Sequence, residues 1–158
     1  MATLKVQPMK VRAGYSHDHG RQGDEAPSQT FKVGNLISPD ANGKYQATAA
    51  GATAATAPNR LAMSFGQNNA APNRRVEYQD PNLFSTIEVT AGCAASSAAL
   101  IKDGLTYGYA IDATTGQGYL DLTNTTNKVF RIEDNRPVKG VIGDTNITVV
   151  ATIIPAAR

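Results

Sequence analysis

The feature that most constrains the fold is the last third of the chain, where apolar and polar residues alternate in short runs. Turn-forming clusters rich in Gly, Asp, Asn and Thr separate these runs. A period of two places successive side chains on opposite faces of a sheet, and the spacing leaves no room for a helix between runs. The pattern predicts strands at 105–111, 119–122, 129–132 and 147–154.

The last of these runs carries bulky side chains on both faces, which is typical of a strand in the middle of a sandwich or against another subunit. Pro155 has no N–H to donate to a neighbouring strand, so the chain should leave the sheet there. Residues 92–100 are the strongest candidate for a helix, ended by Asp103 and Gly104. We predict a mainly-β fold, a compact antiparallel β-sandwich or small β-barrel with at most one or two short helices.

Earlier in the chain, two extended runs flank the segment from Pro39 to Gly43 and predict a hairpin. Asn42-Gly43 is a strong hairpin signal because both residues tolerate positive φ. The Ala- and Thr-rich tract at 47–58 follows, where we expect a strand and then a loop. Alternation at 75–78 and 83–89, on either side of a turn at 80–82, predicts another strand pair.

The first thirty residues differ from the rest and predict an extended N-terminal arm. Leu4, Val6, Met9 and Val11 form a short alternation, whereas the following segment to residue 28 is polar, contains glycine and has few apolar anchors. Such a segment cannot offset the entropy of ordering itself, so we expect it to be mobile when alone. We therefore divide the chain into an arm at 1–30 and a β-rich body at 31–158.

The sequence contains none of the strong catalytic motifs, and we expect no enzyme activity, cofactor or metal. It lacks a G-x-S-x-G elbow, a phosphate-cradling loop and an H-E-x-x-H pair. His17 and His19 have a spacing that could place both rings on one side of a strand, but a zinc site needs further ligands and an ordered scaffold. Cys93, the one cysteine, lies among small residues without a basic neighbour, which indicates a packing role rather than a nucleophile.

The charge balance argues against nucleic acid as a partner. The chain has 15 basic and 13 acidic residues, a net charge of +2, and no basic run interleaved with aromatics. No stretch has the length of a membrane span or the apolar core of a signal peptide, so we expect neither a membrane partner nor secretion. Arg60, Arg74 and Arg75 could grip carboxylates of a partner chain, although isolated surface arginines are usually solvated.

Two parts of the sequence resemble the small capsid decoration, or cementing, proteins of tailed bacteriophages. They are 31–45, with the hairpin signal, and 107–132 together with the closing run at 143–155, and they cover about half of the chain. The resemblance is one of length, texture and order of elements. It implies a β-rich trimer on the outer surface of the expanded capsid, made in the host cytoplasm, whose partners are the major capsid protein and its own copies.

On this interpretation the arm adds as a strand to an exposed sheet edge of a capsid subunit and bridges neighbouring capsomers. The residues expected to bind the capsid are Leu4, Lys5, Val6, Met9, Lys10, Val11 and Arg12. The alternative is a trimeric phage fibre or receptor-binding module that recognises host glycans through exposed Tyr107, Tyr109 and Tyr119. A fibre should show a longer shaft or a heptad repeat, and the sequence contains neither.

Overall fold

The computed structural model describes residues 3–12, 20–52, 59–63, 66, 75–80 and 86–154. Within these ranges the chain is all-β and contains no helix, which confirms the predicted mainly-β fold. The strands are β1 Lys10–Val11, β2 Gly20–Asp24, β3 Leu36–Pro39, β4 Tyr45–Ala47, β5 Arg60–Ala62, β6 Arg75–Gln79, β7 Ile87–Ala95, β8 Thr106–Ile111, β9 Gly118–Asp121, β10 Phe130–Ile132 and β11 Thr145–Ile153.

The last five strands form a closed barrel, here called the C-terminal barrel. Antiparallel pairs link β7 to β11, β11 to β10, β10 to β8 and β8 to β9. A parallel pair between β9 and β7 closes the ring. The four runs predicted from alternation therefore become β8, β9, β10 and β11, and the body is a barrel rather than a sandwich.

Alternation fills the C-terminal barrel because every second side chain points inward. The largest fully buried side chains of its strands are Tyr109, Phe130, Ile87, Leu120, Ile132, Ile147 and Ile153. The outward-facing Val150 of β11 is also buried, at 3 % exposed, and the 133–139 segment continues along the edge of β11 through backbone hydrogen bonds to Val150 and Thr148.

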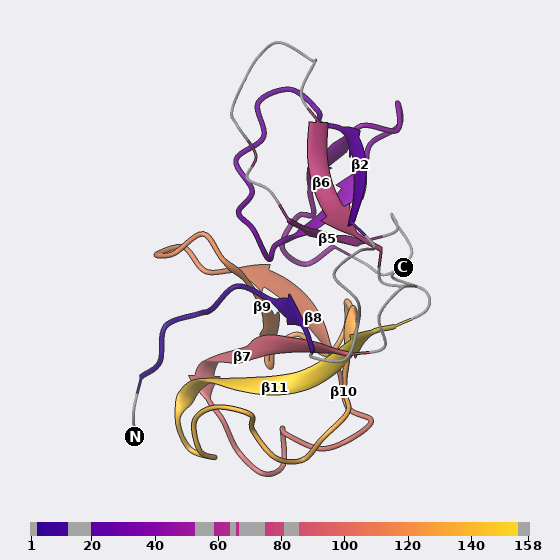
Figure 1. Ribbon diagram of the computed structural model, residues 1–158. Coiled ribbons are helices and arrows are strands. Elements are labelled where there is room, and N and C mark those ends of the chain that lie inside the picture. Colours follow the sequence, from indigo (N-terminus) through magenta and orange to yellow (C-terminus); the bar gives the residue numbers. More distant parts are fainter. Residues whose placement is uncertain are drawn as a thin grey trace.

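The first half of the chain forms a smaller sheet, here called the N-terminal ring, in the order β2-β6-β5-β3-β4. A parallel bridge between Glu25 and Tyr45 connects the two outer strands and curls the sheet into a ring. Its interior is small: Tyr45 and Tyr78 pack with ring centroids 4.5 Å apart. Figure 1 shows this ring above the C-terminal barrel, with β1 between them.

The two rings have the same topology. In each, the first strand pairs with the fifth, the fifth with the fourth, the fourth with the second and the second with the third, all antiparallel. In each, the third strand lies parallel to the first and closes the ring. The chain is therefore built from two structural repeats, β2–β6 and β7–β11.

The correspondence extends to single turns. The turn before the second strand contains Gly34 in the N-terminal ring and Gly104 in the C-terminal barrel, with φ of 83° and 87°. The N–H of Gly34 donates to the carbonyl of Ala62 at 2.8 Å, and the N–H of Gly104 donates to the carbonyl of Ile132 at 2.8 Å. Ala62 and Ile132 each end the fourth strand of their ring.

The small core of the N-terminal ring occupies positions that are also buried in the C-terminal barrel. The strand registers and the shared turn align the five buried members of the smaller cluster with five members of the larger one. The corresponding pairs are Phe31 and Ile101, Ile37 and Tyr107, Ala62 and Ile132, Val76 and Val149, and Tyr78 and Ala151.

A buried polar junction joins the two rings into one body. The side chain of Asn35, only 2 % exposed, donates to the carbonyl of Gly116 at 3.0 Å and accepts from the N–H of Gly118 at 2.8 Å. The N–H of Leu36 donates to the Tyr109 hydroxyl at 3.3 Å. A Cβ at Gly118 would lie 2.4 Å from that hydroxyl oxygen, so glycine leaves the room that the tyrosine ring needs.

Two local predictions were wrong. Residues 92–100 are not helical, because β7 continues to Ala95, where Thr145 pairs with it, and a turn follows. The strands on either side of 80–82 do not pair with each other, since β6 belongs to the N-terminal ring and β7 to the C-terminal barrel. Within the segment predicted as an arm, β2 pairs along its length with β6 of the N-terminal ring.

Replacement of Asn35 tests the junction. Asn35→Ala leaves the buried N–H of Gly118 without its acceptor, so we expect the free energy of unfolding to fall by about 1–3 kcal/mol. Chemical denaturation measures it, and Asn42→Ala, at an exposed turn position, is the control, with an expected change below ~0.5 kcal/mol. A loss no larger than that of the control would contradict the role of Asn35.

The pH dependence of folding provides a second test. Burial raises the pKa of Tyr109 and of Tyr107, and burial together with the neighbouring Tyr78 raises the pKa of Tyr45 to about 12. Because these pKa values are raised in the folded state, the neutral tyrosines stabilise the fold. Their contribution is complete below the pKa of tyrosine in the unfolded chain, about 10, and is lost as the pH rises above it.

We therefore expect part of the tyrosine ionisation, followed by absorbance at 295 nm, to coincide with the loss of the circular dichroism signal at alkaline pH. Ionisation of all six tyrosines near pH ~10 with the fold intact would contradict this expectation.

Candidate binding surface

The N-terminal segment 3–12 lies along the outside of the C-terminal barrel. It begins where the Leu4 N–H donates to Thr145 at 3.2 Å and the Asn146 side chain donates to the Leu4 carbonyl at 2.8 Å. It continues through a 3.0 Å hydrogen bond from the Gln7 N–H to the hydroxyl of Thr90. The segment thus follows the surface of the barrel for its whole described length.

The segment ends as strand β1, which adds to the edge of β7. Lys10 pairs with Glu88 and Val11 with Ile87, antiparallel, and a 3.0 Å ion pair joins Lys10 Nζ to Glu88 Oε2. Further along the same edge, Ala91 pairs with β9. One edge of β7 therefore serves two neighbours, β1 at its start and β9 beyond it.

Two side chains of the segment are buried inside this chain. Val6 is 5 % and Met9 is 3 % exposed, and Met9 belongs to the same apolar cluster as Ile87 of β7 and Leu61 of β5. Gly34 of the N-terminal ring lies directly under the segment, because a Cβ there would be 2.7 Å from the Met9 nitrogen. The segment therefore contacts both rings and acts as a clasp across their junction.

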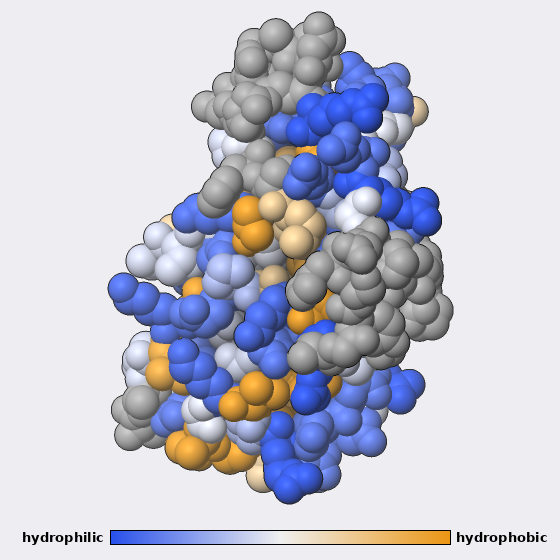
Figure 2. Space-filling view, in the orientation of Figure 1, coloured by the Kyte–Doolittle hydropathy of each residue, from blue (hydrophilic) through white to orange (hydrophobic). Residues whose placement is uncertain are grey.

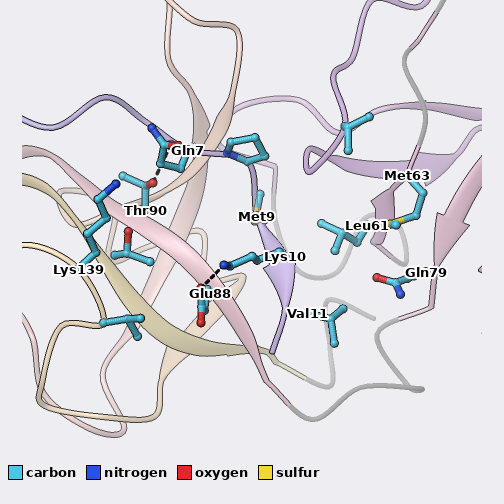
Figure 3. A pocket seen from close by; sticks show the side chains of 14 residues that line it. Gln7, Met9, Lys10, Val11, Leu61, Met63, Gln79, Glu88, Thr90 and Lys139 are labelled. Atoms are coloured by element: carbon cyan, nitrogen blue, oxygen red, sulfur yellow. Dashed lines mark hydrogen bonds and ion pairs between the residues drawn. The ribbon is translucent and has the colours of Figure 1, made fainter. Parts of the chain in front are cut away.

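A groove of about 610 Å³ opens beside this clasp. Figure 3 shows β1 between β7 on one side and Leu61, Met63 and Gln79 of the N-terminal ring on the other. Met63 is 41 % exposed and gives the groove an apolar wall, whereas Lys10 and Lys139 bring positive charge.

Exposed apolar side chains also gather in the loop that precedes β11. Val138, Val141 and Ile142 are 47 %, 66 % and 40 % exposed. Leu4 reaches this loop, since its Cδ1 would lie 3.1 Å from a Cβ at Gly140. Figure 2 shows apolar side chains at the lower end of the molecule, away from the N-terminal ring. The start of the clasp and this loop form a mixed apolar and basic surface.

The structure divides the seven residues predicted to bind a capsid into two groups. Lys5, Lys10 and Arg12 are exposed, although Lys10 already forms its ion pair with Glu88. Leu4 and Val11 are partly buried, and Val6 and Met9 are buried against the chain's own barrel. The groove, the 137–143 loop and the participation of Met63 were not predicted, because they depend on contacts between residues far apart in the sequence.

The tyrosines expected to be exposed for glycan recognition are buried, so that prediction was wrong. Tyr107, Tyr109 and Tyr119 are 3 %, 0 % and 9 % exposed. Tyr107 and Tyr109 belong to the core of the C-terminal barrel, whereas Tyr119, next to the core residue Leu120 in β9, does not. Tyr107 donates its hydroxyl to the carbonyl of Leu100, and Tyr109 accepts from Leu36. Their alternation was recognised correctly, but the barrel closes around them.

The remaining residues singled out from the sequence do not form a site in the described part of the chain. His17, His19 and Arg74 lie outside the described residues, and Cys93 is in β7 with a side chain outside the description. Arg60 forms a 3.7 Å ion pair with Asp80. Across the described ranges, no group of three or more His, Cys, Asp or Glu residues could hold a metal ion, and no helix is long and apolar enough to span a membrane.

Comparison with family models, with curated proteins and with solved structures gives no match to the chain.

Two glycines with matching backbones test the clasp. Gly34→Ala should push the segment 3–12 away from the N-terminal ring, because the new Cβ would meet the Met9 backbone and the Pro8 Cβ at 2.7–2.9 Å. Gly104→Ala imposes the same strain, with φ of 87°, but has nothing within 4 Å.

We expect faster amide exchange and tryptic cleavage at Lys5 and Lys10 in Gly34→Ala alone, measured by mass spectrometry. Equal loosening in both variants would show that backbone strain, and not the clasp contact, is responsible.

Proposed function

We propose that this chain is a bacteriophage head decoration protein that binds the outer surface of the expanded capsid as a trimer and bridges neighbouring capsomers. The observation that best supports this proposal is the clasp surface, where Lys5 and Arg12 project from a segment anchored to a rigid barrel. Beside it lie the exposed Val138, Val141 and Ile142. The major capsid protein is the proposed partner, and the virion is the proposed location.

The composition of this surface suits a protein partner. Apolar side chains that would be costly to leave in water gain free energy when a partner covers them, at about 25 cal/mol per Å². Basic side chains at the rim favour an acidic partner surface and speed association more than they add affinity. Neither contribution requires a catalytic group, so the proposed role is structural and not enzymatic.

Anchoring of the arm changes how the capsid would be bound. Val6 and Met9 are buried in the chain's own fold, so they support the clasp from beneath, and the exposed residues of the segment make the contact. Because the segment is already ordered, binding does not have to supply the entropy of folding it. Three such surfaces on a trimer would raise the avidity by about 10²–10⁴ where their spacing matches the lattice.

Selectivity for expanded heads follows from the same spacing. A protein that binds one state of the lattice better than another shifts the equilibrium toward that state by its differential affinity. Binding across neighbouring capsomers then adds free energy that must be lost before the shell opens under the pressure of packaged DNA.

Co-sedimentation with phage heads stripped of their own decoration protein tests the proposal, in expanded and unexpanded forms. The double variant Lys5→Glu, Arg12→Glu should bind expanded heads about tenfold or more weakly, because both charges lie on the proposed surface. Lys102→Glu, Lys128→Glu changes the net charge equally at exposed positions outside the clasp and should bind as the unmodified protein does. Binding of the unmodified protein to neither head form would overturn the proposal.

A further inference from the structure

The shared topology of the two rings identifies a second strand edge. In the C-terminal barrel, Ala91 of the first strand pairs with the third strand, and Ile87 and Glu88 of the same edge pair with β1. In the N-terminal ring, Glu25 of the first strand's continuation bridges to Tyr45 of the third strand. The ring closes at corresponding places in both repeats.

The register fixes which residues of the second edge correspond to those that bind β1. Arg21 lies opposite Tyr78, as Ile87 lies opposite Ala151, and these two partners align through the fourth strand of each ring. Arg21 and Gln22 are therefore the counterparts of Ile87 and Glu88. Among the residues that the structure describes, none pairs with the outer edge of β2 at these positions, and both side chains are exposed.

We propose that the outer edge of β2, from Gly20 to Gln22, binds an extended strand of a partner protein, antiparallel to β2 and with an acidic side chain opposite Arg21. The proposal is independent of the capsid role, because it rests on the equivalence of the two edges. Among the described residues there is one clasp segment for two corresponding edges, and that segment fills the first edge.

The surroundings of this edge fit such a strand. Asp24 stands where Thr90 stands in the other repeat, and Thr90 accepts a backbone hydrogen bond from Gln7 of the clasp. A carboxylate at this position accepts a backbone N–H more strongly than a hydroxyl does. A hollow of about 210 Å³ adjoins the edge, and Met63 offers one apolar contact there to a side chain of the strand. Its lining is otherwise mainly polar: Gly20, Arg21, Gln22, Glu77 and Gln79.

The charges at the edge argue against a second copy of this chain as the occupant. Antiparallel self-pairing of Gly20, Arg21 and Gln22 would place Arg21 opposite the same residue of the other copy, and like charges directly opposite are unfavourable. The clasp of a second copy would present Val11 at this position, flanked by Lys10 and Arg12. An acidic side chain there forms a favourable cross-strand pair instead.

A pair of peptides tests the proposal. The first is residues 3–12 of this chain with Val11→Glu, and the second is the same peptide with Val11→Lys, so that they differ only in the residue placed opposite Arg21. We expect the first to shift the backbone amide NMR signals of 20–22 in the full chain, and the second to bind about threefold to tenfold more weakly.

The matched protein variants are Arg21→Glu, which should reverse the order of the two peptides, and Arg136→Glu, an exposed control that should preserve it. Signal changes confined to Ile87 and Glu88 would mean that the peptide displaces the clasp and would overturn the proposal. Absence of binding, or an order of affinities that Arg21→Glu leaves unchanged, would overturn it as well.

Discussion

The buried side chain of Asn35 is the contact on which the arrangement of the two rings depends. It donates one hydrogen bond and accepts two, from Gly118 and from the side chain of Gln117. In a low-dielectric interior a polar group must be satisfied or it costs stability, and each of these bonds constrains the direction of its partner. Apolar packing alone would let two small barrels slide against each other, whereas this amide fixes one orientation.

The clasp depends on that orientation. Met9 can be buried only where the N-terminal ring and the C-terminal barrel meet, since its neighbours Leu61 and Ile87 come from different rings. The same holds for Gly34, because the close approach of the Met9 backbone and the Pro8 Cβ exists only when the rings are held together. The proposed capsid-binding surface thus rests on contacts made by side chains that a partner would never touch.

Much of the C-terminal barrel could be predicted from the sequence, because a period of two is a local signal. The same signal indicated that Tyr107 and Tyr109 share a face, but it could not show that the barrel closes around them. Closure depends on the parallel pairing of β7 with β9, which joins residues about thirty positions apart and leaves no local trace. The helix expected at 92–100 failed for a related reason, because pairing with β11 outweighs the helix propensity of small residues.

The repeat was missed although faint traces of it are present. Phe31-Lys32-Val33-Gly34 and Ile101-Lys102-Asp103-Gly104 share an apolar residue, a lysine and a glycine at equal spacing. Most other corresponding positions share only burial, as Ala62 and Ile132 do, and a core tolerates different residues there if the total volume is kept. The position of the clasp could not be predicted for a similar reason. Alternation predicted a strand at Leu4–Val11, but it could not show which sheet that strand would join.

The clasp also sets the order in which the molecule can be completed. Its hydrogen bond to Asn146 spans 142 positions, so the clasp cannot complete its docking before the residues of β11 have been synthesised. Until then its apolar residues and the edge of β7 remain unpaired, and chains interrupted before β11 cannot close either the barrel or the clasp. A docked clasp is consequently a mark of a chain that has folded through β11, and a protease that cleaves the loose segment would discriminate such molecules from those that lack β11.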